Sequence, residues 1–225
     1  MEKPEVLPRI TRNAKWFESL RAVHQRRLES RVRNAIETSV ELLSGKLALP
    51  NKIFYGFHGG EEVANASYRT ICVGKSAHEY LRWPRVDGVL LGIMAHEISH
   101  ISDSEANNCS NKPVRFIESV IEEGKADAVG AYVGGEQYMS EYCGEIKDDF
   151  KAHAYRALAA QKPRLHSTGQ HLNSIADDYT IGFSLVRDII ALERVSEVFE
   201  IHRKPFSFYF EKAAELAYVY EAATR

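Results

Sequence analysis

The 225-residue sequence has few cysteines, little net charge and no long apolar run. Its three cysteines, Cys72, Cys109 and Cys143, are odd in number and form no C-x-x-C pair, which argues against a disulfide framework or a thiolate metal site. The net charge of −2 argues against a protein dedicated to nucleic acids or membrane surfaces. No apolar stretch approaches the roughly 18 residues that span a bilayer, and no signal-peptide pattern follows the charged N-terminus. We therefore expect a cytoplasmic protein with free thiols, no nucleic-acid partner and no membrane span.

What the sequence does have is enough apolar residues for an ordinary core, 44% of the total, arranged mostly with helical periodicity. Residues 1–11 are expected to be an irregular lead-in, and two strands are expected at 52–57 and 66–73. Helices are expected at 11–43, 86–102, 113–134, 136–160, 181–202 and 206–223. The predicted fold is α+β and mostly helical, with a small antiparallel sheet before the helix at 86–102 and a helical C-terminal half.

No internal repeat or low-complexity linker divides the chain. We expect residues 1–225 to form a single domain with three regions. These are an N-terminal helical extension (1–49), a sheet with two helices (50–135) and a C-terminal helical subdomain (136–225).

The most informative motif is H-E-x-x-H at residues 96–100, directly after the apolar run 89–95. Because residues four apart lie on one face of a helix, His96 and His100 can bind one metal ion. Glu97 lies beside them, where it can act on a water molecule as a general base. This is the first half of a catalytic zinc site, which normally has three protein ligands.

The third ligand has to come from elsewhere in the chain. Residues 101–106 lack the glycine and third histidine with which a metzincin motif continues, so a glutamate on the next helix is favoured. Glu122 and Glu123 are the candidates. If Glu123 is the ligand, Asp127 shares its face and can accept a hydrogen bond from the far nitrogen of a ligating histidine.

H-E-x-x-H followed by E-G-x-A-D resembles the gluzincin metallopeptidases, the thermolysin-like clan with two histidines and one glutamate as zinc ligands. The resemblance covers about residues 50–135 and implies a zincin-like fold. It favours Glu123 over Glu122 as the ligand, because the aspartate four positions on is Asp127. Residues 179–182 are also similar to a segment of small predicted zinc proteases of this clan.

The resemblance implies a zinc-dependent metallopeptidase that acts on a peptide or protein substrate, with Glu97 as general base. In this clan a tyrosine or histidine of the C-terminal half stabilises the developing oxyanion, and Tyr179 is favoured here, with His171 and His166 as alternatives. The strand at 66–73 would align the substrate by backbone hydrogen bonds. The alternative is a non-catalytic zincin-like domain that serves as a binding module. Endopeptidase or aminopeptidase action, the substrate and the oligomeric state stay open.

Overall fold

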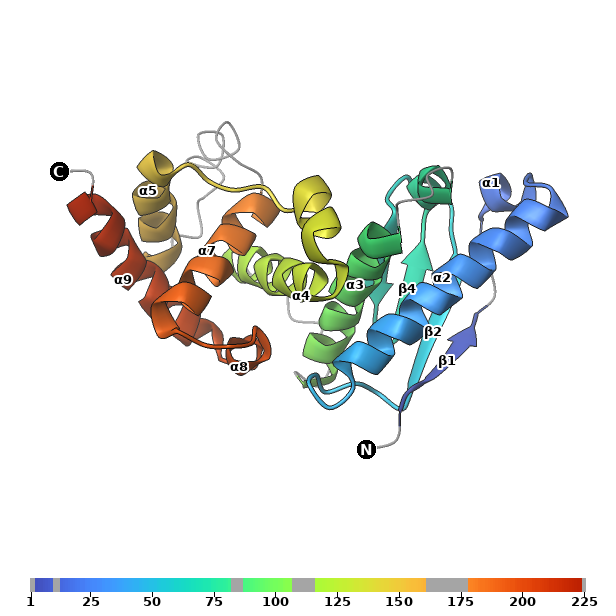
Figure 1. Ribbon diagram of the computed structural model, residues 1–225, viewed down its shortest axis with the longest axis horizontal. Coiled ribbons are helices and arrows are strands. Elements are labelled where there is room, and N and C mark those ends of the chain that lie inside the picture. Colours follow the sequence, from blue (N-terminus) through green and yellow to red (C-terminus); the bar gives the residue numbers. More distant parts are fainter. Residues whose placement is uncertain (1–2, 10–12, 82–86, 107–115, 161–177, 224–225) are drawn as a thin grey trace. The chain divides into compact units, whose positions relative to one another are not determined.

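The computed structural model describes residues 3–9, 13–81, 87–106, 116–160 and 178–223, and these form an α+β structure (Figure 1). The chain divides into two compact units. Unit 1 comprises residues 1–111 and 129–141, and unit 2 comprises residues 112–128 and 142–225. Helix α4 (Phe116–Tyr142) contributes residues to both.

Unit 1 contains a four-stranded sheet in the order β1-β2-β4-β3. Its strands are β1 (Glu5–Pro8), β2 (Lys52–Phe57), β3 (Ala64–Ser67) and β4 (Thr70–Val73). β2 is parallel to both β1 and β4, and only β3 runs antiparallel to its neighbour. The prediction of an antiparallel sheet is therefore wrong. After β2 the chain forms the outer strand β3, and β4 then turns back between β2 and β3, so that β4 runs parallel to β2. The irregular lead-in at 1–11 is also wrong, since β1 lies there.

The single strand predicted at 66–73 is in fact the tight hairpin of β3 and β4. Tyr68 turns the chain with a φ of 55°, a value in the left-handed region that few non-glycine residues adopt. The alternating pattern runs through the turn, which hid it in the sequence. As a consequence β3, whose residues are only partly buried, forms the outer strand of the sheet.

The helices of unit 1 cover the sheet. The segment predicted as one helix at 11–43 is divided into α1 (Lys15–Glu18) and α2 (Ala22–Leu43), and α2 ends where predicted. A short 3₁₀ helix, η1 (Lys75–Leu81), precedes α3 (Asp87–Ala106). One face of α2 is buried from Leu28 to Leu43, and the Ser39 hydroxyl donates to the Leu91 carbonyl of α3 at 3.1 Å.

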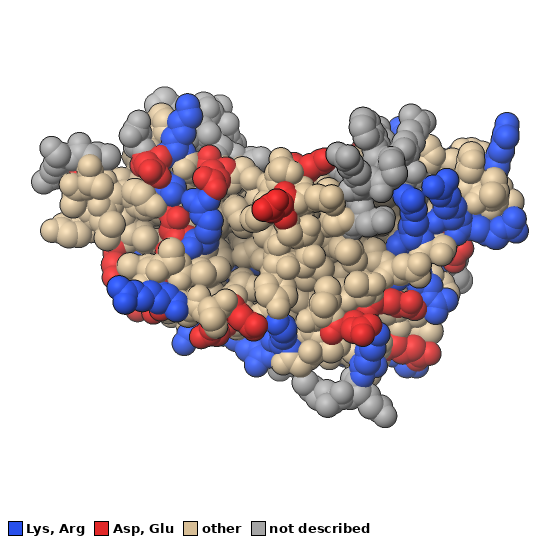
Figure 2. All heavy atoms as spheres, in the orientation of Figure 1, with Lys and Arg blue, Asp and Glu red and all other residues tan. Residues whose placement is uncertain are grey.

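Basic side chains gather over the N-terminal half of α2, on the right in Figure 2. Elsewhere on the face in view, acidic and basic side chains are scattered among uncharged residues, in keeping with the net charge of −2. Among the described residues, no helix has the length and apolarity required to cross a bilayer.

Unit 2 is helical in its described part. Besides its share of α4 it has α5 (Asp148–Ala159), α7 (Asp178–Glu193), α8 (Phe199–His202) and α9 (Phe206–Ala223). The last helix matches its predicted bounds. The helices predicted at 136–160 and 181–202 are each interrupted, the first between α4 and α5 and the second at Arg194, whose φ is 53°.

A buried polar network links α5, α7 and α9. Lys151 lies 3.1 Å from Asp188, and the hydroxyls of Tyr155 and Tyr220 donate to the same carboxylate at 2.7 and 2.8 Å. Burial opposes the charge on Lys151, but hydrogen bonds to Tyr220 and Asp188 outweigh it and raise the pKa of the lysine. A lysine that stays charged and is bonded to a carboxylate and a hydroxyl has a structural role as one half of a buried ion pair, because only an uncharged amine is a nucleophile.

Candidate metal centre

The H-E-x-x-H residues lie in the middle of α3, which is buried on most sides. Met94, Ile98 and Ile101 are fully inaccessible, so the helix has little freedom to shift. His96 and Glu97 are buried, with 8% and 6% of their surface exposed, and His100 is half-buried. Ionisable groups at such depth require partners or a metal ion, because desolvation of a charge is costly.

The two histidines converge on one point. Their Nε2 atoms are 3.1 Å apart, and the ring centroids are 4.8 Å apart with an interplanar angle of 74°. Two nitrogens that bind one zinc ion at about 2.0–2.1 Å in a tetrahedron lie about 3.3 Å apart. The observed spacing is close to this value, as expected for side chains four residues apart on a helix.

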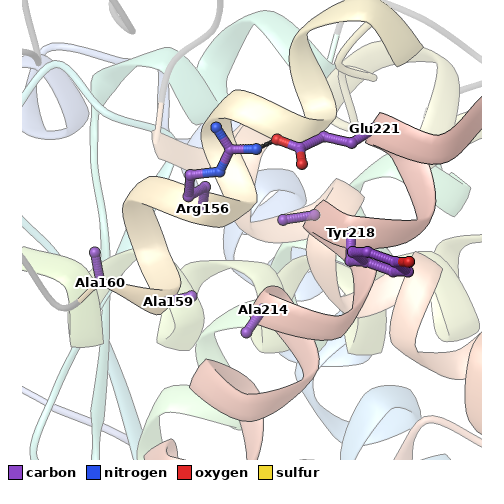
Figure 3. A pocket seen from close by; sticks show the side chains of 7 residues that line it. Arg156, Ala159, Ala160, Ala214, Tyr218 and Glu221 are labelled. Atoms are coloured by element: carbon purple, nitrogen blue, oxygen red, sulfur yellow. Dashed lines mark ion pairs between the residues drawn. The ribbon is translucent and has the colours of Figure 1, made fainter. Parts of the chain in front are cut away.

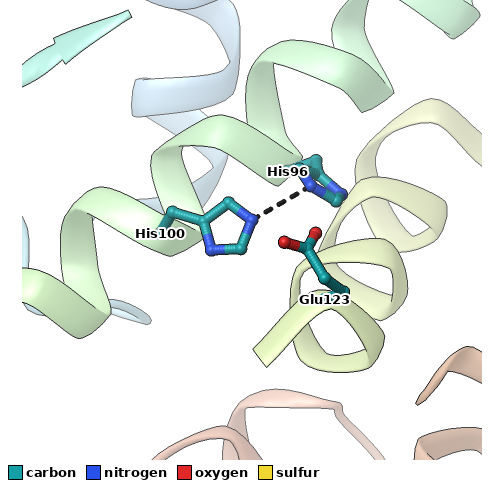
Figure 4. Close-up of side chains that lie close together, drawn as sticks. All are labelled: His96, His100 and Glu123. Atoms are coloured by element: carbon teal, nitrogen blue, oxygen red, sulfur yellow. Dashed lines mark hydrogen bonds between the residues drawn. The ribbon is translucent and has the colours of Figure 1, made fainter. Parts of the chain in front are cut away.

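Glu123 completes a set of three. One ligand atom each from His96, His100 and Glu123 all lie within 4.8 Å of one another, and the Glu123 carboxylate points toward the two rings (Figure 4). This is the one set of three or more histidine, cysteine or acidic side chains close enough to hold a metal that the described residues contain. Two neutral imidazoles and one carboxylate form a donor set that suits zinc.

The turn of α4 that carries Glu123 is fixed by a close helix contact within unit 2. A Cβ at Gly124 would lie 2.2 Å from the backbone of Gly182 on α7, and one at Gly182 would lie 2.1 Å from the Val120 carbonyl oxygen. Only two glycines allow backbones to approach this closely. α7 therefore packs against the helix of Glu123 immediately beside that residue.

The other predicted site residues lie at different positions and depths in the structure. Glu122 is not among the three clustered side chains. Asp127 is 2% exposed, one helical turn beyond Glu123. Tyr179 lies in the first turn of α7 and is 48% exposed. His166 and His171 fall outside the described residues.

The charges of Glu97 and Asp127 affect the pKa values of two cysteines. Burial raises the pKa of Cys72 on β4, and the negative charges of Glu97 and Glu62 raise it further. Burial likewise raises the pKa of Cys143, and the charge of Asp127 adds to this effect. Both thiols are therefore poor nucleophiles at neutral pH, since the thiolate is the reactive form.

Sequence reasoning missed one residue beside His96. The hydroxyl oxygen of the buried Tyr138 lies 3.3 Å from His96 Nδ1. A signal was present in the glycine spacing, since Gly88 and Gly92 precede His96 at four-residue intervals, as Gly130 and Gly134 precede Tyr138. Such spacing indicates two helices in close contact.

A second concave feature lies in unit 2, on the surface formed by α5 and α9 (Figure 3). Its lining consists of Arg156, Ala159, Ala160, Ala214, Ala217, Tyr218 and Glu221. Arg156 and Glu221 form an ion pair there, and the rest of the lining consists of four alanines and Tyr218. In the part of the chain that the structure describes, no histidine or cysteine lines this groove, and its one carboxylate is paired with Arg156, so the groove offers no set of metal ligands like that of the α3 site.

Comparison with known proteins finds no matching family model, no matching curated protein and no matching solved structure. What the chain can do therefore has to be argued from its own residues.

Proposed function

We propose that this chain is a zinc-dependent metallopeptidase whose zinc ligands are His96, His100 and Glu123. The observation that carries the proposal is the clustering of these three side chains, with Glu97 next to the first of them on a buried helix. A zinc ion held there would polarise a substrate carbonyl and lower the pKa of a water molecule.

Glu97 is the proposed general base. Its carboxylate would accept a proton from the attacking water and then pass it to the leaving amine, so that the amine departs neutral. A site that only binds a metal has no use for such a carboxylate. This is what favours a peptidase over the alternative of a non-catalytic binding module.

The outer strand β3 is the proposed platform for the substrate. β3 pairs with β4 on one side, and it also packs near α3. An extended peptide added to β3 by backbone hydrogen bonds would therefore run near α3, the helix that carries Glu97.

Tyr179 remains the proposed donor to the developing oxyanion. Its exposure of 48% leaves its ring open to a substrate, and it lies one turn before Gly182, which packs on the helix of Glu123. A phenolic O–H can supply the hydrogen bond that the oxyanion requires.

The test is Glu97→Gln, assayed on a peptide library with and without a chelator. The amide cannot accept the proton, so hydrolysis should fall by at least about 100-fold while the zinc content stays near one per chain. Glu41→Gln, the same change on an exposed part of α2, is the control and should cut at the wild-type rate. Full activity in Glu97→Gln would exclude the proposed mechanism, and a wild-type protein that binds zinc but cuts nothing would favour the binding module.

A further inference from the structure

Tyr138 is one of the most deeply buried aromatic residues of the chain, with 1% of its surface exposed. Its hydroxyl lies 3.3 Å from Nδ1 of His96, on the side of the ring opposite to the Nε2 that faces His100. Both residues belong to unit 1. A polar group at this position is placed to influence the histidine directly.

Three glycines form the slot that holds the tyrosine ring. A Cβ at Gly92 would lie 2.2 Å from the Tyr138 ring, one at Gly130 would lie 2.7 Å from it, and one at Gly134 would lie 2.6 Å from the Tyr138 Cβ. Any side chain at these three positions would collide with Tyr138. The ring therefore packs on bare backbone from both α3 and α4, which leaves its hydroxyl little choice of position.

A break in α4 brings the ring into this slot. Gly135 has φ 64° and ψ −153°, a conformation that is essentially restricted to glycine. In an unbroken helix Tyr138 would lie about 12 Å along the axis from Gly130, eight residues at about 1.5 Å each. The non-helical residue turns the chain so that Tyr138 instead contacts Gly130.

We infer that Tyr138 is a positioning residue that holds the His96 imidazole in the orientation and tautomer required for metal binding through Nε2. This inference rests on the zinc site proposed above and assigns to that site a partner for His96 that the motif does not contain. The prediction that Asp127 accepts a hydrogen bond from one of the two ligating histidines stands beside this inference, which concerns Nδ1 of His96 alone.

The chemistry of imidazole explains why the contact matters. A neutral histidine that gives its Nε2 lone pair to a metal carries its proton on Nδ1, and this N–H needs an acceptor when it is buried. The Tyr138 oxygen is within reach to accept it. When the hydroxyl oxygen accepts this N–H, the hydrogen bond leaves the Nε2 lone pair for the metal and limits rotation of the ring, so that less free energy is lost when the metal binds.

The experiment measures zinc affinity by chelator competition in the full chain and in Tyr138→Phe. Phenylalanine keeps the ring in its slot and removes only the hydroxyl. The dissociation constant for zinc should rise by about 10- to 100-fold, the usual cost of losing the partner of a ligating histidine. The visible spectrum of the Co²⁺-loaded protein should also change, because the spectrum reports the geometry of the ligands.

Tyr209→Phe is the matched control. Tyr209 is equally buried, and its hydroxyl donates to the Ile201 carbonyl at 2.6 Å in unit 2. It should leave zinc affinity and the Co²⁺ spectrum unchanged. If Tyr138→Phe unfolds, Gly130→Ser, which displaces the ring, takes its place in the comparison.

The outcomes separate the inference from the function on which it rests. Wild-type affinity and an unchanged Co²⁺ spectrum in Tyr138→Phe would show that Tyr138 only fills space, while the zinc site itself would stand. If the wild-type chain binds neither Zn²⁺ nor Co²⁺, the proposed function fails, and the role of Tyr138 fails with it.

Discussion

At the scale of single residues, the site depends on side chains that are costly to bury. His96, Glu97 and Asp127 are all less than one-tenth exposed. Such groups are typical of places where a protein binds or reacts, because an apolar residue in the same place would stabilise the fold more. The shared helix face of His96 and His100 could be predicted from the sequence because their relation is local to one helix.

Glu123→Ala tests the choice of the third ligand. Loss of one of three ligands should reduce zinc content well below one per chain, measured by elemental analysis after dialysis. Glu122→Ala changes the adjacent residue of the same helix and should retain zinc. The reverse result, with zinc lost only in Glu122→Ala, would make Glu122 the ligand.

At the scale of elements, the site depends on where helices end, break and touch. α3 is a regular helix whose motif could be read directly. α4 could be read only in part, because its close contacts are with Gly92 of α3 and Gly182 of α7, and nothing in the local pattern names those partners. The sequence predicted a helix end near Gly134 and Gly135, and the structure has its break at Gly135. The sequence did not predict that the helical segment after this break brings Tyr138 beside His96.

Gly135→Ala should therefore affect both stability and metal binding. A Cβ at Gly135 meets no atom within 4 Å, so the cost is the backbone conformation alone, about 1–3 kcal/mol of unfolding free energy. Because relaxation of this strain would move Tyr138, the dissociation constant for zinc should rise as well. Chemical denaturation and chelator competition measure the two effects.

Gly45→Ala provides the comparison. Gly45 follows the end of α2 with a φ of 81°, and a Cβ added there would also meet no atom within 4 Å, so the cost of the substitution again comes from a positive φ. The substitution should lower stability without altering zinc affinity. Equal losses of zinc affinity in both variants would show that the effect of Gly135→Ala is a general consequence of destabilisation.

At the scale of the whole molecule, the chain comprises two compact units, and α4 belongs to both. Each unit has its own means of stabilisation. Unit 1 has a mixed sheet covered by α2 and α3, and unit 2 has α5 packed on α9 around the Lys151 network. The candidate ligands come from α3 and α4, so metal binding should act on the stability of the folded chain as well as on activity.

Zinc should raise the midpoint of thermal unfolding, because a ligand that binds only the folded state stabilises it. At a free zinc concentration of 100 times the dissociation constant the gain is about 2.7 kcal/mol. For a chain of this size that corresponds to about 5–10 °C. Scanning calorimetry with and without chelator measures the shift, and the double variant His96→Ala, His100→Ala should show none. An unchanged midpoint in the wild type at saturating zinc would contradict a specific site.

The sequence by itself determined the mostly helical α+β class, most of the helix positions and the shared face of His96 and His100. Each follows from periodicity within a few turns of one chain segment. Only the tertiary structure decided that β4 lies between β2 and β3, that Glu123 lies close to the two histidines, and that the Tyr138 hydroxyl lies beside His96 Nδ1. These relations join residues distant in the sequence and depend on which helices come into contact, whereas the local pattern predicted only the helix break near Gly135.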